Sequence, residues 1–501
     1  MTETNLIDEL LAEQQSLTAV ERFSQKHANS PGHLQARYYK DLIPLSKPLE
    51  GEQYAFAVDL DKCTGCKACV SACHSLNGLD EEEVWRDIGL LRTADEGSSY
   101  QQTVTTACHH CLDPACADGC PVLAYEKDQE TGIVRHLDDQ CIGCQYCVLK
   151  CPYEVPKYNK KRGIVRKCDM CHQRLAVGEA PACVQACPSG AIAIQIVGQE
   201  TLRAQIQPGD RLLPGAFDSS YTRPTTNYAS SRTFRGRPAD EHKLRVEHAH
   251  WPLVFMLVFT QAAVGLLLVN GLWLGQAAAN VVAFVLLNIG LGLSVLHLGQ
   301  PLKAWRAFLG WRKSWMSREI MAFSAFAGVA AALTASGYVT LLPVPDVVKE
   351  LVPHVVPFLL GATIVSGLAA VFTSCMIYVD TRRAFWSMPT TSLKFYGTAI
   401  GLGLAAAGFW NSSFALAGAG TLIVMFLAEL FLLKSPAVSK PRAILFGPLQ
   451  KLQITRALLL VAALCTWQFP VAAFVALLLA QIIERGCFFM ASAAPKMAGG
   501  I

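Results

Sequence analysis

The feature that most constrains this chain is a set of four cysteine groups in its first half. Sixteen of the 19 cysteines lie between Cys63 and Cys187. Each group ends with a thiol that three residues separate from the thiol before it. The groups are Cys63, Cys66, Cys69 and Cys73; Cys108, Cys111, Cys116 and Cys120; Cys141, Cys144, Cys147 and Cys151; and Cys168, Cys171, Cys183 and Cys187. Any fold that this half adopts must hold many soft ligands at short spacing.

The redox environment decides whether these thiols form disulfides or bind metal. The N-terminal stretch MTETNLIDELLAEQQSLTAVERF has no basic start, no apolar core and no twin-arginine pair. It lacks the features of an export signal, so we expect the cysteine-rich half to stay in the reducing cytoplasm. Clustered thiols in that compartment bind metal more often than they form disulfides.

The run CIGCQYCVLKCP, residues 141–152, favours iron–sulfur clusters over zinc. Repeated C-x2-C units also build zinc sites, but zinc does not require the C-x2-C-x2-C-x3-C-P run. In ferredoxins with two clusters, the fourth cysteine of such a run binds the neighbouring cluster. Four groups therefore predict four [4Fe–4S] clusters in two linked pairs. Such a row of centres conducts single electrons and has no substrate pocket, which predicts a redox subunit without catalytic residues of its own.

Polarity divides the chain into four segments. Residues 1–53 predict a polar leader that begins with an amphipathic or frayed surface helix. Residues 54–200 predict an α+β iron–sulfur domain of the ferredoxin-like type, because the apolar stretches YAFAVDL and AIAIQIV flank the cysteine groups. Residues 201–247 are rich in Pro, Gly, Ser, Thr and Arg and predict an extended arm or linker. Residues 248–501 predict an all-α polytopic membrane bundle.

Apolar segments long enough to span a bilayer begin at Trp251. They predict about eight helices, or seven if the last two are one, because only Phe469 and Pro470 separate those two. Gly and Ala are frequent in these segments, which suits close helix packing in lipid. The expected ranges are 251–274, 277–298, 317–340, 354–379, 393–410, 414–433, 454–469 and 470–490.

Basic residues in alternate loops orient this bundle. Because positively charged loops stay in the cytoplasm, they predict that the N-terminus and the iron–sulfur domain lie on the cytoplasmic side of the inner membrane. The net charge of +4 and the lack of a basic groove interleaved with aromatic residues argue against a nucleic-acid partner. The loop residues are Lys303, Arg306, Arg312, Lys313 and Arg318; Arg382, Arg383 and Lys394; and Lys434, Lys440, Arg442, Lys451 and Arg456.

Other charged residues are expected to have ordinary structural roles. The acidic run Asp80–Glu83 predicts a solvated face, and so does the basic stretch from Lys157 to Lys167, although that stretch could also raise a cluster potential or dock a partner. Glu429 and Cys375 are expected to be packing or interfacial residues.

The cysteine half, through CIGCQYCVLKCPYEVPKY and CHQRLAVGEAPACVQACPSGAI, resembles the electron-transfer subunit of dimethyl sulfoxide reductase-type molybdoenzymes. The apolar half resembles the membrane anchor subunit of the same enzymes, through HWPLVFMLVFTQ, SVLHLGQPLKAW, SREIMAF and QIIERGCFF. Together they cover residues 54–200 and 248–490, so the chain resembles a fusion of two normally separate subunits. The resemblance implies transfer of electrons from the quinone pool, as menaquinol or ubiquinol, to a separate molybdopterin-containing catalytic subunit.

The resemblance also implies that the first cysteine group pairs with the fourth, and the second with the third. The implied ligand sets are Cys63, Cys66, Cys69 and Cys187; Cys168, Cys171, Cys183 and Cys73; Cys108, Cys111, Cys116 and Cys151; and Cys141, Cys144, Cys147 and Cys120.

Ionisable side chains at the cytoplasmic helix ends are candidates for a quinol site. Quinol releases two protons with its two electrons, and an imidazole or a carboxylate can accept them. For any one such residue, an interfacial capping role is the other interpretation, but the resemblance implies quinol binding for His297 and Glu319. The candidates are His297, Glu319, Tyr378, Asp380 and Arg382.

Three hypotheses remain open at this stage. The first is a quinol-oxidising electron-transfer subunit, and the second is a passive tether that binds lipid but no quinone. The third, a redox-driven pump, would need buried ionisable residues across the whole bundle, and the outer halves of the helices supply almost none. A cytoplasmic partner also leaves the substrate open between dimethyl sulfoxide and an oxyanion such as nitrate.

Overall fold

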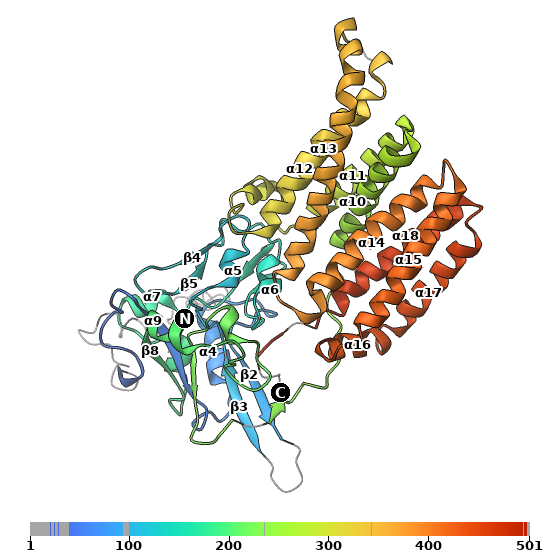
Figure 1. Ribbon diagram of the computed structural model, residues 1–501. Coiled ribbons are helices and arrows are strands. Elements are labelled where there is room, and N and C mark those ends of the chain that lie inside the picture. Colours follow the sequence, from blue (N-terminus) through green and yellow to red (C-terminus); the bar gives the residue numbers. More distant parts are fainter. Residues whose placement is uncertain are drawn as a thin grey trace, which may run out of the picture.

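The protein consists of an iron–sulfur domain of short strands and helices and a bundle of long helices beside it (Figure 1). The computed structural model describes residues 21, 25, 29, 40–93, 100–234, 236–341, 343–493 and 495–497. The surface helix expected in the opening stretch lies almost wholly outside these residues. The predicted order of an α+β domain followed by an all-α bundle is confirmed.

The two apolar stretches that flank the cysteine groups form neighbouring strands. β1 (Glu52–Asp59) is the centre of a three-stranded sheet, antiparallel to β8 (Ile192–Gly198) and parallel to β9 (Asn227–Ala229). The register sets Val58 opposite Ile192. The end of β1 therefore lies beside the start of β8, and this brings the first and the fourth cysteine groups to the same end of the sheet.

The rest of the domain consists of short elements around the cysteine loops. A second sheet has the order β10 (Arg237–Pro238), β2 (Asp87–Arg92), β3 (Gln101–Thr106). Two hairpins pair β4 (Tyr125–Lys127) with β5 (Val134–His136) and β6 (Lys157–Asn159) with β7 (Ile164–Arg166). The helices are η1 (Lys40–Leu42), α4 (Ala68–Leu76), α5 (Ala115–Asp118), α6 (Tyr146–Lys150), α7 (His172–Ala176), α8 (Ala182–Gln185) and α9 (Gln199–Gln205).

Residues 201–247 run along the iron–sulfur domain. They contain η2 (Ser219–Tyr221) and contribute β9 to the first sheet and β10 to the second. Backbone hydrogen bonds hold this segment to the second cysteine group, since Leu112 N donates to Arg223 O at 2.8 Å and Thr225 N to His109 O at 3.1 Å. The segment thus completes the edges of the domain.

The helical half has a long helix in each of the eight expected ranges. Six of them are long and apolar enough to cross a membrane, and the bent pair 436–446 and 450–465, at 84°, would make a seventh span. The last two helices are separate, because α17 ends at Cys465 and α18 begins at Pro470, a residue suited to a first helical turn. The long helices are α10 (Trp251–Val269, continued by η3, Asn270–Leu274), α11 (Ala277–Val295), α12 (Trp315–Ser336), α13 (Asp346–Val379), α14 (Met388–Ala407), α15 (Ser412–Leu432), α17 (Gln450–Cys465) and α18 (Pro470–Met490). The short ones are η4 (Pro301–Phe308), η5 (Val339–Leu341), η6 (Ala384–Trp386), η7 (Pro436–Val438) and α16 (Ser439–Phe446).

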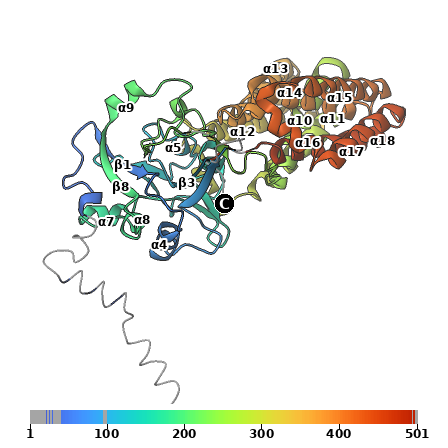
Figure 2. The same cartoon turned by 90° about the horizontal axis from the view of Figure 1, so that it is seen from below.

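Small residues allow α10 to pack closely in the middle of this bundle, where it contacts α11, α13, α14 and α18. A Cβ atom on Gly265 of α10 would overlap the carbonyl oxygen of Ala399 on α14. Such close backbone approach is typical of helices that associate in lipid. A second view shows the bundle and the iron–sulfur domain side by side, in contact at one end of the bundle (Figure 2).

Candidate cluster sites and membrane site

Four thiols line a first cavity at the end of the β1–β8 sheet. They are Cys63, Cys66, Cys69 and Cys187. Thr105 from the second sheet closes the cavity, and its hydroxyl lies 3.6 Å from Cys69 Sγ. Gly65 has a φ of +72°, a left-handed conformation that lets the loop turn between two of the thiols. The first and the fourth cysteine groups thus meet around one space with the donors that an iron–sulfur cluster requires.

A second cavity is lined by thiols from the second and the third cysteine groups. They are Cys120, Cys141, Cys144 and Cys147. Backbone amides point at two of them, with Ala124 N 3.2 Å from Cys120 Sγ and Gly143 N 3.3 Å from Cys141 Sγ. Amide hydrogen bonds to sulfur favour the thiolate form that binds metal and hold the cysteine loop in position.

For the thiols outside these two cavities, the charged groups that shift their pKa values indicate two further sets of cluster ligands. Burial and the neighbouring Cys183 thiol raise the pKa of Cys73 to about 12. Burial and the neighbouring Cys151 thiol raise the pKa of Cys116 well above its ordinary value. Cys73 therefore lies beside the fourth group and Cys151 beside the second.

The arrangement of these thiols suits clusters better than single ions. Among the residues that the structure describes, no three His, Cys, Asp or Glu side chains are close enough to hold one metal ion. Four thiols spread around a cavity suit a cubane, in which each iron binds its own thiolate. The structure thus brings eight cysteines together around two cavities, and it puts Cys73 near Cys183 and Cys116 near Cys151.

The two charged runs of the iron–sulfur domain contact each other. Glu83 is only 2 % exposed and pairs with Arg166 at 3.0 Å, while Asp80 pairs with Lys161 at 3.0 Å. The expectation of two solvated faces is therefore wrong for Glu83. The pairing joins residues that lie about eighty positions apart, so neither run reveals it by itself.

Lys167, also expected on a solvated face, is buried between two cysteine sets. Its ammonium group lies 3.6 Å from Cys108 Sγ and donates to the carbonyl oxygen of Cys168 at 2.8 Å. That expectation is wrong because Lys167 directly precedes Cys168, a buried residue of the fourth cysteine group, and is itself only 3 % exposed. A buried cation beside thiolate ligands favours the more negative, reduced state of a bound cluster.

Glycines bring the helical bundle into contact with the second cavity. A Cβ atom on Gly299, in the loop after α11, would overlap the carbonyl oxygen of Gly163. Gly143 packs against the backbone of Gly163 and Gly299; it lies in the loop 141–147 of the third cysteine group, called the cysteine loop below. The amide of Gln300 also donates to the carbonyl of Ile142 at 3.0 Å. The loop after α11 is thereby held directly against the cysteine loop.

His297 lies in this same loop. Its Nδ1 is hydrogen-bonded to the carbonyl oxygen of Ser294, which can only accept, so Nδ1 carries the proton. Its Nε2 is buried and has no hydrogen-bond partner within the described ranges. In the neutral ring this nitrogen holds the lone pair, so His297 presents a buried proton acceptor beside the second cavity.

Glu319 lies in the second turn of α12 and is 7 % exposed. The hydroxyl of Ser374 on α13 donates to its carboxylate. Ile320, which follows Glu319, and Leu298, which follows His297, both pack against the core of the second cavity. The structure therefore brings His297 and Glu319 to the same end of the bundle, next to the cysteine loop.

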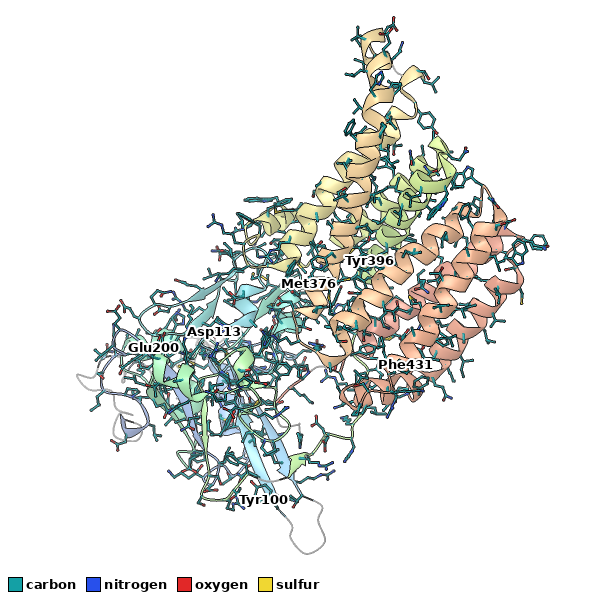
Figure 3. All side chains as sticks on the ribbon, viewed as in Figure 1. Tyr100, Asp113, Glu200, Met376, Tyr396 and Phe431 are labelled. Atoms are coloured by element: carbon teal, nitrogen blue, oxygen red, sulfur yellow. The ribbon has the colours of Figure 1, made fainter. Side chains whose placement is uncertain are left out.

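Tyr378 lies in a buried aromatic cluster at the end of α13. Its ring centroid is 5.2 Å from that of Trp386 and 5.1 Å from that of Phe488. Tyr146 of α6 donates its hydroxyl to the carbonyl of Ile377 at 3.0 Å, which joins the cysteine loop to α13. Met376, labelled in Figure 3, marks this end of α13, where the bundle meets the iron–sulfur domain.

The other two predicted quinol-site residues hold the two domains together. Asp380 lies 2.6 Å from Lys150 Nζ on α6, and its carbonyl accepts a hydrogen bond from the Tyr221 hydroxyl at 2.8 Å. Arg382 is exposed, and its guanidinium carbon lies 4.6 Å from the centroid of the Tyr221 ring. None of these contacts involves His297 or Glu319.

A buried charge cluster, which we define as Lys394, Glu429, Arg456, Glu484 and Arg485, connects α14, α15, α17 and α18. Lys394 Nζ lies 2.6 Å from Glu429 and 2.8 Å from Glu484, and Arg456 lies 2.7 Å from Glu429. Arg485 lies 3.4 Å from Glu484 and also donates to Gln261 on α10 at 3.1 Å. The side chains of all five charged residues are at most 4 % exposed.

This cluster corrects two expectations. Glu429 is not a packing or interfacial residue, because it pairs with two cations. Lys394 and Arg456 do not lie in loops, because α14 begins at Met388 and α17 at Gln450, earlier than the apolar pattern predicted. Because charged residues lie in the first two turns of these two helices, the apolar pattern made the preceding loops look longer than they are.

Both halves of the chain match known proteins. Residues 54–75 match the family described as 4Fe-4S binding domain, residues 100–197 the 4Fe-4S dicluster domain, and residues 246–494 the DMSO reductase anchor subunit (DmsC). The B subunit of anaerobic dimethyl sulfoxide reductase from Escherichia coli (strain K12) is 41 % identical over 148 residues, which are 28 % of this chain and 72 % of that protein. The chain belongs to the dimethyl sulfoxide reductase family.

Further relatives of this dimethyl sulfoxide reductase family member match its iron–sulfur half. The B subunit of the corresponding reductase from Haemophilus influenzae is 39 % identical over 150 residues, 28 % of this chain and 73 % of that protein. Hydrogenase-2 operon protein HybA of Escherichia coli O157:H7 is 36 % identical over 203 residues, 35 % of this chain and 60 % of that protein. The predicted resemblance is confirmed: the chain is an iron–sulfur electron-transfer subunit fused to a multi-pass membrane anchor.

Proposed function

We propose that the protein oxidises quinol at the membrane and passes the electrons through four [4Fe–4S] clusters to a separate molybdopterin-containing catalytic subunit. The observation that carries this proposal is the contact between the His297 loop and the cysteine loop of the second cavity. That contact puts a buried proton acceptor next to the thiols that would hold the electron acceptor. The relatives named as dimethyl sulfoxide reductase subunits support a catalytic partner of that class.

The protein's own side chains supply the proton transfer. A quinol that loses two electrons also loses two hydroxyl protons, so its site needs acceptors within hydrogen-bond reach. His297 Nε2 has the free lone pair to accept one proton, and Glu319, oriented by Ser374, accepts the other. The aromatic cluster around Tyr378 supplies an apolar wall against which a quinone ring can pack.

The cysteine sets define a direction for the electrons, which bound [4Fe–4S] clusters would carry one at a time. Cys144 of the second cavity packs against the core of the bundle, so this set lies nearest the membrane. Lys167 contacts Cys108 of one further cysteine set and Cys168 of the other, so it lies between these two sets. Cys66 of the first cavity is exposed, so this set suits contact with the catalytic subunit.

The basic loops support placement of the iron–sulfur domain on the cytoplasmic side of the inner membrane. The catalytic partner would then be cytoplasmic, and its substrate would be dimethyl sulfoxide or an oxyanion such as nitrate. Since quinol protons are released and the substrate is reduced on the same side, turnover should build no membrane potential. A potential-sensitive dye that responds to turnover in sealed vesicles would contradict this placement.

The proposal is tested by rapid mixing of H297A membranes with a soluble menaquinol or ubiquinol analogue, with cluster reduction followed by EPR. We expect reduction by quinol to fall by about a hundredfold or more, whereas reduction by dithionite stays unchanged. H354A is the matched control, because His354 is an exposed histidine of α13. An H297A variant as fast as H354A would support a passive tether instead.

A further inference from the structure

The loop between α11 and α12 contains a short 3₁₀ helix, η4 (Pro301–Phe308), whose three sides differ in character. We call residues 300–314 of this loop the interfacial segment; it lies at the end of the bundle that contacts the iron–sulfur domain (Figure 1). A 3₁₀ helix has three residues per turn, so side chains three positions apart form a row. Leu302, Trp305 and Phe308 form the first row, which is apolar, and they are 95 %, 68 % and 44 % exposed.

The second side of η4 rests on the iron–sulfur domain. Ala307 is buried and packs against the core of the second cavity. After η4, the amide of Gly310 donates to the Pro121 carbonyl at 2.8 Å, and the hydroxyl of Ser314 donates to the Gly119 carbonyl at 2.7 Å. These contacts fix the segment on the domain. Since the rows of a 3₁₀ helix point in different directions, the apolar row points away from the domain.

The third side of η4 is basic. Lys303 and Arg306 form its row, and Lys303 donates to a carbonyl of the iron–sulfur domain at 2.8 Å. Within the described ranges, the Nε of Arg306 has no hydrogen-bond partner. Residues 248–318 contain no Asp or Glu, so no carboxylate lies nearby in the sequence. Among the described residues, only Lys313 of the segment has a carboxylate partner, Asp118 at 3.1 Å.

Two arginines of the interfacial segment lie over neighbouring tryptophans. The guanidinium carbon of Arg306 is 6.0 Å from the ring centroid of Trp305, and that of Arg312 is 5.4 Å from that of Trp311. Stacking on an indole uses the face of the guanidinium group and leaves the N–H donors at its edge available. Such donors bind the oxygens of a phosphate group in pairs. Tryptophan itself is typical of the level where lipid headgroups begin.

The apolar row of η4 continues the outer surface of the membrane bundle. Val295 and Leu296 at the end of α11 are exposed, and so is Leu309 directly after η4. The segment joins α11 and α12, two of the helices that are long and apolar enough to cross a membrane. It therefore lies where acyl chains meet headgroups, with exposed apolar side chains next to guanidinium groups.

The chain also passes between the iron–sulfur domain and the bundle just before α10, and the charges there are arranged differently. Arg245 lies 3.6 Å from Glu154 and 3.9 Å from Glu247. The rings of His248 and His250 pack on each other, with centroids 4.8 Å apart. Because carboxylates of the protein already neutralise Arg245, this crossing offers an anionic headgroup less than the interfacial segment does.

We propose that the interfacial segment binds an anionic phospholipid, with the apolar row of η4 among the acyl chains and with Arg306 and Arg312 at the phosphate group. A zwitterionic headgroup would leave the positive charge of the segment without compensation, whereas an anionic one neutralises it. The combination of exposed apolar residues, tryptophans and basic residues is that of helices that lie in the plane of a membrane surface. This inference goes beyond the proposed function and does not depend on quinol oxidation.

Native mass spectrometry of the full-length protein with its clusters measures the lipid preference. The protein in detergent is titrated with phosphatidylglycerol or with phosphatidylcholine of the same acyl chains. We expect phosphatidylglycerol to bind about tenfold more tightly or better, and R306Q/R312Q to lose most of this preference. K434Q/R442Q is the matched control and should keep it, because Lys434 and Arg442 are exposed basic residues between α15 and α17.

Photocrosslinking then locates the lipid. In nanodiscs, a phosphatidylglycerol with a diazirine in its acyl chain should crosslink to residues 300–314, as mapped by peptide mass spectrometry. We expect L302S to lower this crosslinking several-fold, because it removes an apolar contact with the acyl chains. L45S is the control, since Leu45 is also 95 % exposed but lies next to η1 in the iron–sulfur domain.

Several results would overturn the inference. They are equal binding of the two lipids, an unchanged preference in R306Q/R312Q, an equal loss in K434Q/R442Q, and crosslinks that avoid residues 300–314. Release of the lipid by inorganic phosphate would indicate a site for free anions, and a dimer that dissociates in L302S would assign the apolar row to a second copy of the chain. If R306Q/R312Q does not assemble, the crosslinking experiment gives the answer. A protein that binds the lipid but does not oxidise quinol would overturn only the proposed function.

Discussion

The two halves of the helical bundle bury ionisable side chains in opposite ways. In the half formed by α10–α13, His297 and Glu319 each have one hydrogen bond from or to a neighbour and, among the described residues, no ion-pair partner. In the half formed by α14–α18, the buried charge cluster pairs every charged group with another. Groups without a charged partner are available to a bound molecule, whereas paired groups are occupied by the fold.

The cost of burying charge explains why the difference matters. A charge deep in an apolar bundle is tolerated when partners surround it, and removing one partner leaves the others exposed to an unfavourable environment. A single imidazole can instead stay neutral until a substrate proton arrives, and a single carboxylate held by a hydrogen bond becomes neutral when it accepts one. We therefore expect substitutions in the charge cluster to affect folding and substitutions at His297 or Glu319 to affect electron transfer.

The largest effect should come from E429Q. Within the described part of the chain, Glu429 is the only carboxylate that pairs with Arg456, and its loss leaves two neighbouring cations with one carboxylate fewer. We expect a loss of about 3–5 kcal/mol, seen as a much lower yield and unfolding midpoint of the detergent-purified protein. The double variant E429Q/R456M should recover most of this loss, because Lys394 keeps Glu484 as its partner at 2.8 Å. E350Q, at an exposed position of α13, is the control. Equal midpoints for E429Q and E350Q would refute the comparison.

The next largest effect should be kinetic and come from E319Q. The amide keeps the size of the side chain and can still accept the Ser374 hydrogen bond, but it cannot accept a proton. We expect quinol-driven cluster reduction to fall by about 10²–10⁴-fold, the range of lost acid–base catalysis, with an unfolding midpoint unchanged or slightly raised. S374A should lower the rate less, because it removes only the orienting hydrogen bond. A large drop in the midpoint of E319Q with an unchanged rate would place Glu319 with the structural charges.

These differences show what the sequence can and cannot predict. The spacing of the cysteines predicts cluster sites because the ligands of one loop are close in sequence, and the strand pair β1–β8 explains why the first group meets the fourth. The charge cluster could not be predicted, because Lys394, Glu429 and Glu484 come from three helices whose packing no local pattern contains.

Helix boundaries account for another part of the difference. Arg383 lies in the loop between α13 and η6, as the sequence predicts, yet it is 6 % exposed, because it donates to the Leu149 carbonyl on α6 and to the Ser492 hydroxyl after α18. His248 and His250 lie immediately before the apolar run that begins at Trp251, so a pattern search for helices passes over them. In the sequence, only the alternation of His and Ala next to the predicted membrane surface draws attention to these two histidines.

A smaller effect is expected at the contact between the His297 loop and the cysteine loop. In G299A the added Cβ atom would overlap the Gly163 carbonyl, so the two loops must separate. We expect quinol-driven cluster reduction to slow by about tenfold, because small displacements of reacting groups lower rates steeply. G292A on α11 is the matched control, since its Cβ atom would meet nothing within 4 Å. Equal rates for G299A and G292A would show that this contact does not position the site.

The smallest effect should come from D380N, at the contact between the iron–sulfur domain and the helical bundle. Asp380 pairs with Lys150 at 2.6 Å, but its side chain is 31 % exposed, so water already solvates part of the carboxylate. We expect a loss of about 1 kcal/mol at most, and less at high salt, because partly exposed ion pairs are weak and screened. D346N removes the exposed pair between Asp346 and Lys349 and should change nothing measurable. D380N and E429Q could instead lower the free energy of unfolding equally. The contact between the two domains would then exclude water as fully as the bundle interior does. In that case, the contrast between the two bundle halves would reflect the geometry of the charged partners and not their burial.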